Sequence, residues 1–150
     1  MIKFEKFNWW RFLLSVVIFA VIAQIVHTLS AFISMGYYEL PAYASVWSKL
    51  MMPHAGPPPA SFMLLSFIYS LVGGIIFAGF YLRYREAIHR KTEVKKGLCY
   101  GMSIFFLATI PSSLMLHLLI NMPFMLIIYW TLEMLIIYLV NGMIVAKLNK

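Results

Sequence analysis

Two ionisable side chains, His27 and Glu133, lie inside long apolar runs of this 150-residue sequence. Both can gain or lose a proton, and the charged form of either costs several kcal/mol in hydrocarbon unless it is paired. An ionisable residue in such a position is therefore a candidate functional residue. The two residues are far apart in the sequence, so the helices that carry them decide whether they meet.

Other polar side chains extend this candidate site. If both apolar runs are helical, His27 and Glu133 lie roughly 12 and 13 Å inside the same end of their helices, at a rise of 1.5 Å per residue. The residues expected near this depth form one candidate intramembrane polar site: Gln24, His27, Tyr69, Ser70, Ser112, Ser113 and Glu133. Two roles remain open for this set, namely proton, ion or small-molecule binding, and hydrogen bonding that only fixes helix packing.

The sequence contains few residues that could form a metal site, a haem site or a known catalytic motif. Zinc needs three or four ligands, whereas His27 and Glu133 supply two, so no metal site is expected. Haem held by two histidines would pair His27 with His117, which lies roughly 7 Å nearer its helix end, a gap that helix tilt would narrow. The sequence has no nucleotide-binding loop and no Ser-His-Asp set, and its single cysteine is Cys99. No catalytic residue is assigned, and an enzyme is the less favoured class.

The composition indicates the elements that must position these side chains. Hydrophobic residues make up 63% of the chain and charged residues 11%, whereas soluble domains carry roughly 25% charged residues. A helix that crosses a bilayer needs about 20 apolar residues. Four runs meet this requirement: residues 12–35, 62–84, 97–120 and 124–146. We expect an all-α polytopic membrane protein, in which residues 1–150 form a single four-transmembrane-helix bundle.

The segment 36–60 joins the first two runs and cannot be helical throughout, because it contains several prolines. Pro41 suits the start of a short helix. Four residues would share one face of that helix: Val46, Trp47, Leu50 and Met51. Two structures remain open for this outer loop, an interfacial helix lying on the membrane and a packed loop with an aromatic anchor.

Small residues recur at a spacing of four in the second and third runs, and we call each such row a small-residue ladder. In lipid, helices associate where small side chains let their backbones approach closely. The helix-packing candidates are Ser66, Ser70, Gly74, Ala78, Gly97 and Gly101. Pro111, in the middle of the third run, should kink that helix. Ser112 and Ser113 are placed to satisfy the backbone groups that the proline frees.

The basic residues predict the orientation of the chain. Of the 12 Lys and Arg residues, six lie in the loop 83–96, and only Lys49 lies in the outer loop. Cytoplasmic loops carry the excess of basic residues, so both termini and the loop 83–96 should be cytoplasmic in a prokaryotic inner (plasma) membrane. The net charge of +7 then suits anionic lipid headgroups, and nucleic-acid binding is not expected because no soluble basic domain exists.

Scattered positions resemble a known group of proteins. They are His27 late in the first helix, the segment KGLCYG at Lys96–Gly101, Pro111, and Trp130 with Gly142 in the fourth helix. The pattern is similar to an uncharacterised family of small four-helix integral membrane proteins of bacteria and archaea. The resemblance implies a fold and no activity.

Three classes of function remain open. The small-residue ladders favour a non-catalytic subunit of a homo-oligomer or a larger membrane complex. The alternative is a transporter or binding protein for a proton, an ion or a small molecule, centred on Glu133 and His27. A second alternative is a quinone- or haem-binding membrane subunit or a small membrane enzyme. No cofactor is assigned.

The orientation can be tested by cysteine labelling. In a Cys99→Ser background, cysteines placed at Ser45 or Ala55 should react with a membrane-impermeant reagent added to intact cells. Cysteines at Ala87 or Thr92 should react only after the cells are opened, because the basic loop stays inside. Labelling of the basic loop from outside would reverse the orientation.

Overall fold

Four helical spans dominate the structure, a computed structural model that describes residues 8–54 and 56–149. Helix accounts for 82% of the described residues, which contain no β-strand. Eight elements make up the spans and their connections: α1 (Trp9–Tyr38), η1 (Pro41–Val46), α2 (Ala60–Tyr84), η2 (Arg85–Ala87), α3 (Glu93–Ile104), η3 (Phe105–Thr109), α4 (Ile110–Leu119) and α5 (Phe124–Leu148). The spans α1, α2–η2, α3–η3–α4 and α5 are each long and apolar enough to cross a membrane. The prediction of an all-helical chain with four such spans is confirmed.

The first and third spans start before their apolar runs do, because local caps extend them. The N–H of Arg11 donates to the side chain of Asn8 at 3.1 Å, so α1 begins at Trp9 rather than at residue 12. Likewise, the N–H of Lys95 donates to Thr92 Oγ1 at 3.3 Å, so α3 begins at Glu93 rather than at residue 97. Such side chains satisfy N–H groups of the first turn, which a hydropathy pattern does not register.

The outer loop is a packed loop with an aromatic anchor. Its helical part, η1, is a six-residue 3-10 turn that starts at Pro41 and stops at Val46. The expected interfacial helix with Val46, Trp47, Leu50 and Met51 on one face does not form, because the backbone at Trp47 is extended. Instead, Trp47 Nε1 donates to the Tyr38 carbonyl at 3.0 Å, and the two rings lie 5.0 Å apart. The indole therefore holds the loop against the end of α1.

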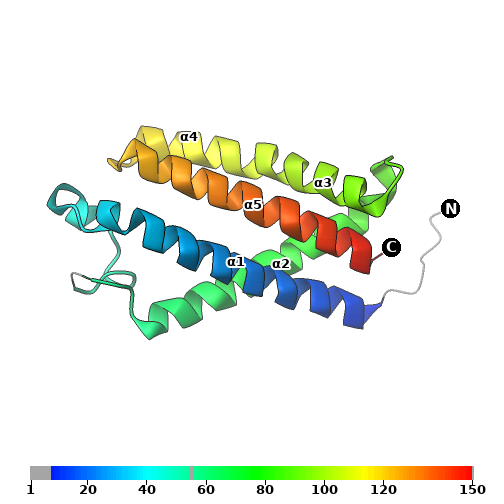
Figure 1. Ribbon diagram of the computed structural model, residues 1–150, viewed down its shortest axis with the longest axis horizontal. Coiled ribbons are helices and arrows are strands. Elements are labelled where there is room, and N and C mark those ends of the chain that lie inside the picture. Colours follow the sequence, from blue (N-terminus) through cyan, green and yellow to red (C-terminus); the bar gives the residue numbers. More distant parts are fainter. Residues whose placement is uncertain (1–7, 55, 150) are drawn as a thin grey trace.

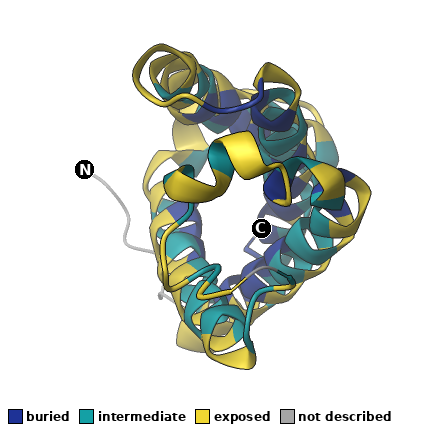
Figure 2. Ribbon diagram, turned by 90° about the vertical axis from the view of Figure 1, so that its left-hand side faces the viewer, coloured by how far each residue is buried: buried dark blue, intermediate teal, exposed yellow. Residues whose placement is uncertain are grey.

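The spans pack in a fixed order around α5. Helix α5 lies between α1 and the α3–η3–α4 span, and α2 crosses α1 at an angle (Figure 1). The Ala60 end of α2 therefore lies apart from α4 (Figure 1). Buried residues lie mainly towards the inside of the four-span bundle, and exposed residues lie mainly on its outside (Figure 2). Many exposed residues are large and apolar, such as Leu107 and Leu118, each 77% exposed, which is the surface expected of helices that face lipid.

Glycines bring α3 and α5 into backbone contact. A Cβ atom added at Gly97 would overlap the carbonyl of Gly142, and one added at Gly101 would overlap the carbonyl of Tyr138. Conversely, a Cβ atom at Gly142 would overlap the carbonyl of Gly97. This is the close approach that small residues permit between helices in lipid. The partner of the small residues on α3 is thus a helix of the same chain.

The ladder on α2 divides between two environments. A Cβ atom at Gly74 would already lie 2.9 Å from the Val16 carbonyl, so this glycine marks the crossing with α1. Ala78 is also buried in this contact. Ser66 and Ser70 are half-buried and border a cavity instead. Only the half of the ladder nearest the basic loop therefore packs against α1.

Pro111 is accommodated by a π-helical segment, η3, that precedes it. The N–H of Ile110 donates to the carbonyl of Phe105, five residues earlier, as in the π-bulges that occur as single turns in α-helices. Ser112 Oγ donates to the Ala108 carbonyl at 2.6 Å. A wider turn and a serine hydroxyl thus supply hydrogen bonds around the residue that lacks an N–H.

The buried apolar residues form two clusters at opposite ends of the spans. The first lies towards the basic loop and comprises Val16, Phe19, Ala23, Phe77, Ala78, Tyr81, Tyr100, Ile137, Val145 and Ala146. The second lies towards the outer loop and comprises Tyr38, Met122, Leu126 and Ile127. On α1 and α5, His27 and Glu133 fall between the residues of the two clusters. The two ionisable residues therefore occupy the layer that separates the apolar cores.

The glycine contact predicts a sharp difference between two Gly→Ala variants. Gly142→Ala should lower the free energy of unfolding by about 1–3 kcal/mol, because the new methyl must push α3 away. Gly79→Ala should be neutral or stabilising by up to about 1 kcal/mol, since nothing lies within 4 Å of a Cβ atom there. Titration of a denaturing detergent into the protein in mild detergent measures both. Equal stability of the two variants would contradict the contact.

Candidate functional site

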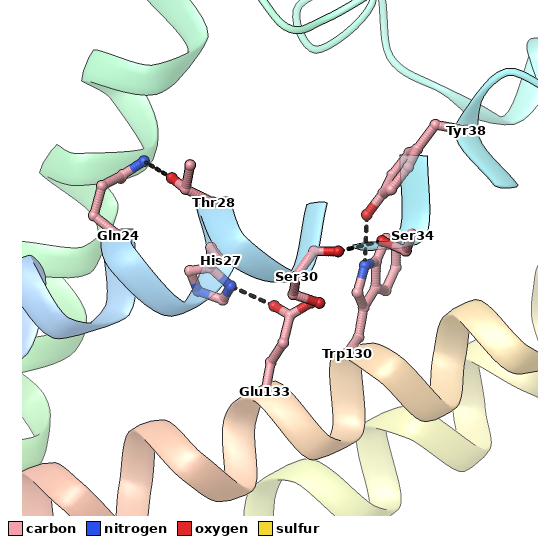
Figure 3. A network of polar contacts seen from close by, with 8 residues as sticks. All are labelled: Gln24, His27, Thr28, Ser30, Ser34, Tyr38, Trp130 and Glu133. Carbon is pink, nitrogen blue, oxygen red and sulfur yellow. Dashed lines mark hydrogen bonds and ion pairs between the residues drawn. The ribbon is translucent and has the colours of Figure 1, made fainter. Parts of the chain in front are cut away.

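His27 of α1 and Glu133 of α5 are hydrogen-bonded to each other. His27 Nδ1 lies 2.6 Å from Glu133 Oε2 (Figure 3). The Glu133 side chain is 8% exposed and that of His27 is 37% exposed. The carboxyl is therefore enclosed, while part of the imidazole is open to its surroundings.

A contact this short requires a proton between the two atoms. Three arrangements supply it: an imidazolium donates to a carboxylate, a carboxylic acid donates to a neutral imidazole, or a neutral imidazole donates its Nδ1–H to a carboxylate. The first two have no net charge, which removes most of the cost of burying an ionisable group in an apolar layer, whereas the third leaves a net negative charge. The two arrangements without net charge leave a hydrogen on Nε2, the other ring nitrogen, whereas in the third Nε2 is an acceptor.

Further polar contacts surround the pair on its outer side. Trp130 Nε1 donates to the Tyr38 hydroxyl at 2.8 Å, joining α5 to the end of α1 (Figure 3). Ser113 Oγ lies 2.7 Å from Thr131 Oγ1, and the latter donates to the Ile127 carbonyl at 2.7 Å. These bonds connect α4, α5 and α1 next to Glu133. Helix α5, which carries Glu133, is therefore hydrogen-bonded to α1 on one side and to α4 on another.

The smaller of two adjoining cavities contains most of the predicted polar site. Its volume is about 380 Å³, and it lies between α1, the η3–α4 turn and α5. Four of the expected residues border it: His27, Ser112, Ser113 and Glu133. The structure therefore brings together polar groups from three of the four spans.

The larger cavity has a volume of about 610 Å³ and occupies the space where α2 diverges from the other spans. Its wall is mainly apolar and includes Phe19, Phe62, Phe77 and Ile137. His27 borders both cavities, as do Met134 and Tyr138. The imidazole thus stands where the two spaces meet.

The remaining predicted residues take less central positions. Gln24 Nε2 lies 3.5 Å from Thr28 Oγ1 on the same helix and 3.9 Å from Met63 Sδ of α2, and its Oε1 is buried without a partner among the described residues. Tyr69 is 66% exposed, and with Ser70 it borders only the larger cavity. The α2 residues therefore belong to the apolar space and do not reach Glu133.

Sequence reasoning missed three contributors to this site. Thr131, two residues before Glu133, holds Ser113, and Met134 and Tyr138 form the shared wall of the two cavities. A hydroxyl on the same helix as Glu133 could have suggested Thr131. No pattern in the sequence singles out Met134, because methionine is abundant throughout the apolar runs.

The described residues that could bind a metal or haem are not grouped at one place. Within residues 8–54 and 56–149, no three His, Cys, Asp or Glu side chains come together. His117 packs against the Phe124 ring and borders a different cavity from His27.

Compared with known protein families, curated proteins and solved structures, the chain shows no significant match.

The hydrogen-bonded pair predicts unequal effects of two substitutions. His27→Ala should lower the free energy of unfolding by about 1–3 kcal/mol, because it leaves a buried carboxyl without its partner. Glu133→Gln should cost less, since the amide keeps hydrogen-bonding atoms of similar shape. Thermal unfolding in mild detergent, combined with the double variant as a thermodynamic cycle, measures the coupling.

The matched control is His54→Ala, because His54 is exposed in the outer loop and its removal should leave stability unchanged. Additive effects of His27→Ala and Glu133→Gln would show that the two residues do not stabilise each other.

Proposed function

We propose that the protein binds a lipophilic small molecule that carries a hydrogen-bond acceptor, such as a quinone, within its membrane-spanning bundle. The observation that supports this proposal is the position of His27, which is bonded to Glu133 through Nδ1 while it borders both cavities. Ligand sites typically combine apolar walls with a few placed polar groups.

The free nitrogen of His27 defines the polar part of the ligand. Nε2 has no hydrogen bond to any described residue. In the two arrangements without net charge, which an apolar layer favours, it carries a hydrogen and can donate to a ligand oxygen. Glu133 acts here as a positioning residue, because its bond to Nδ1 orients the ring. A carbonyl oxygen is the simplest group that fits such a donor.

The larger cavity defines the apolar part of the ligand. It lies between α2 and the other spans and is partly open to its surroundings, and exposed residues of α2 such as Tyr69 and Ile76 border it. In a bilayer, these residues would face hydrocarbon, so a lipophilic molecule could enter without crossing the headgroup layer. The volume of about 610 Å³ lies within the range of about 300–1,000 Å³ typical of small-molecule pockets.

The proposed setting is a prokaryotic cell membrane, with both termini and the loop 83–96 in the cytoplasm. Eleven of the 12 Lys and Arg residues lie in the termini and this loop. The start of α1, the start of α3 and the end of α5 lie at one end of the molecule (Figure 1). The positive-inside rule then orients the outer loop away from the cytoplasm.

Proton or ion transport is a further use of the same pair. The two arrangements without net charge differ only by the movement of the shared proton across a 2.6 Å contact, and intramembrane Glu and His residues occur in proton relays. Glu133→Gln would abolish such transport while leaving the fold intact. A Glu133→Gln protein that remains fully active in cells would exclude this use.

A second candidate function is that of a non-catalytic subunit in an oligomer or a larger membrane complex. The observation that favours it is the divergence of α2, along which Ser66, Ser70 and Gly73 border the open cavity. A helix from another subunit or a second copy could pack against these small residues. The mass of the purified particle in mild detergent distinguishes a monomer from such assemblies.

Quinone binding can be measured directly on the purified protein. Decylubiquinone titrated into the protein in mild detergent should quench tryptophan fluorescence saturably, because Trp130 borders the smaller cavity. His27→Ala should weaken binding roughly tenfold, as expected for the loss of one hydrogen bond. Ser70→Trp should abolish binding by filling the larger cavity.

The matched control for Ser70→Trp is Ile75→Trp, because Ile75 is an exposed residue of α2 that does not border the cavity. Ile75→Trp should bind decylubiquinone like the unmodified chain. Quenching that is linear in quinone concentration, or equal in all variants, would show partition into the micelle and contradict a site.

A further inference from the structure

A shallow hollow on the face of α3 and η3 that points away from α5 combines two cations with an apolar wall. Its volume is about 420 Å³. Arg90, from the loop before α3, and Lys95, in the first turn, lie at its start, and the wall continues along Leu98, Met102 and Phe106. Cys99 and Ser103 lie between these apolar side chains. The hollow lies away from both cavities of the candidate site.

The spacing of these residues places them on one face of the helix. Positions 95, 98, 99, 102, 103 and 106 follow the three- and four-residue intervals of a single helical stripe. Gly97 and Gly101, which contact α5, lie on the opposite face. Met102 is 37% and Phe106 is 59% exposed. The stripe therefore faces the surroundings of the protein rather than its core.

The guanidinium of Arg90 is held at the start of the hollow. Arg90 Nη1 donates to the His89 carbonyl at 3.1 Å, and Nη2 lies 3.5 Å from Cys99 Sγ, so the guanidinium folds over the first turns of α3. The nearby carboxylate of Glu93 pairs with Lys96 at 3.5 Å. Lys95 is exposed. Positive charge thus collects at the point where the apolar stripe begins.

We propose that this hollow binds one anionic phospholipid. The phosphate lies against Arg90 and Lys95, and the first part of an acyl chain lies along Leu98, Met102 and Phe106. The stripe from Lys95 to Phe106 runs about 16 Å along the helix axis, parallel to the lipid chains of a bilayer. Cations at the end of a membrane-spanning helix lie at headgroup depth and attract anionic lipids. This proposal does not depend on the function of the His27–Glu133 site.

The single cysteine of the chain provides the measurement, because Cys99 borders the hollow. The full-length protein in mixed micelles is treated with iodoacetamide, and alkylation of Cys99 is followed by mass spectrometry. Dioleoyl-phosphatidylglycerol should slow alkylation saturably, whereas dioleoyl-phosphatidylcholine at the same mole fraction should not. Equal protection by both lipids would contradict a site for an anionic headgroup.

Two matched pairs of variants separate a built site from diffuse attraction. Arg90→Gln/Lys95→Gln should raise the half-saturating phosphatidylglycerol content by about fivefold per cation removed. Lys91→Gln/Lys147→Gln removes the same charge outside the hollow and should have a much smaller effect. Phe106→Ala should also weaken protection, whereas Leu107→Ala, at an exposed neighbour outside the hollow, should not.

The half-saturating lipid content is compared, rather than the initial alkylation rate, because Arg90 itself contacts Cys99. Equal shifts for the two double variants would show that the lipid responds only to the overall positive charge of the protein surface, and this result would overturn the proposal. Glycerol 3-phosphate serves as a soluble headgroup without acyl chains. Full protection by glycerol 3-phosphate at the concentration used for the lipid would assign the hollow to a free phosphate ester instead.

Discussion

The backbone contact between α3 and α5 is the constraint on which the candidate site depends. Gly97 and Gly101 pack against α5 at Gly142 and Tyr138, where no side chain separates the helices. Such a contact fixes the rotation of α5 about its own axis, because a small turn would place a side chain between the backbones. Glu133 precedes Gly142 by nine residues, or about two and a half helical turns. The carboxyl therefore points away from α3 and towards α1.

The crossing of α1 and α2 explains why space remains beside His27. Gly74 contacts the Val16 carbonyl and Phe19 near the basic end of the helices. Two helices that cross at an angle separate with distance from the crossing point. Because α5 lies beside α1, this crossing carries α2 away from α5, and the larger cavity lies between α2 and the α3 and α5 helices, while Gln24 of α1 still contacts Met63 of α2. The polar pair thus lies where the apolar packing of the bundle is interrupted.

These contacts also change the meaning of the small-residue ladders. In the sequence, the ladders are compatible with association between chains or within one chain. In the structure, Gly74, Gly97 and Gly101 contact helices of the same chain. Only Ser66 and Ser70, beside the open cavity, remain for a ligand or another helix. The same two serines are therefore shared by the two proposed functions.

The sequence by itself determined the number of spans and the depth of their polar residues. Hydropathy identifies the apolar runs, and the constant helical rise places His27 and Glu133 at one level. These properties are local, so they do not require knowledge of any other helix.

Only the tertiary structure decided which residues at that level meet. Tyr69 has a similar depth to Glu133, yet it is exposed because α2 diverges from α5. Ser113 reaches Thr131 because α4 lies beside α5. The rotation of each helix follows from contacts between residues distant in the sequence, such as Gly97 with Gly142. The periodicity of one helix contains no information about the rotation of its neighbour, so the sequence left open whether Glu133 pairs with His27 or with another polar side chain, and the packing of the helices decided it.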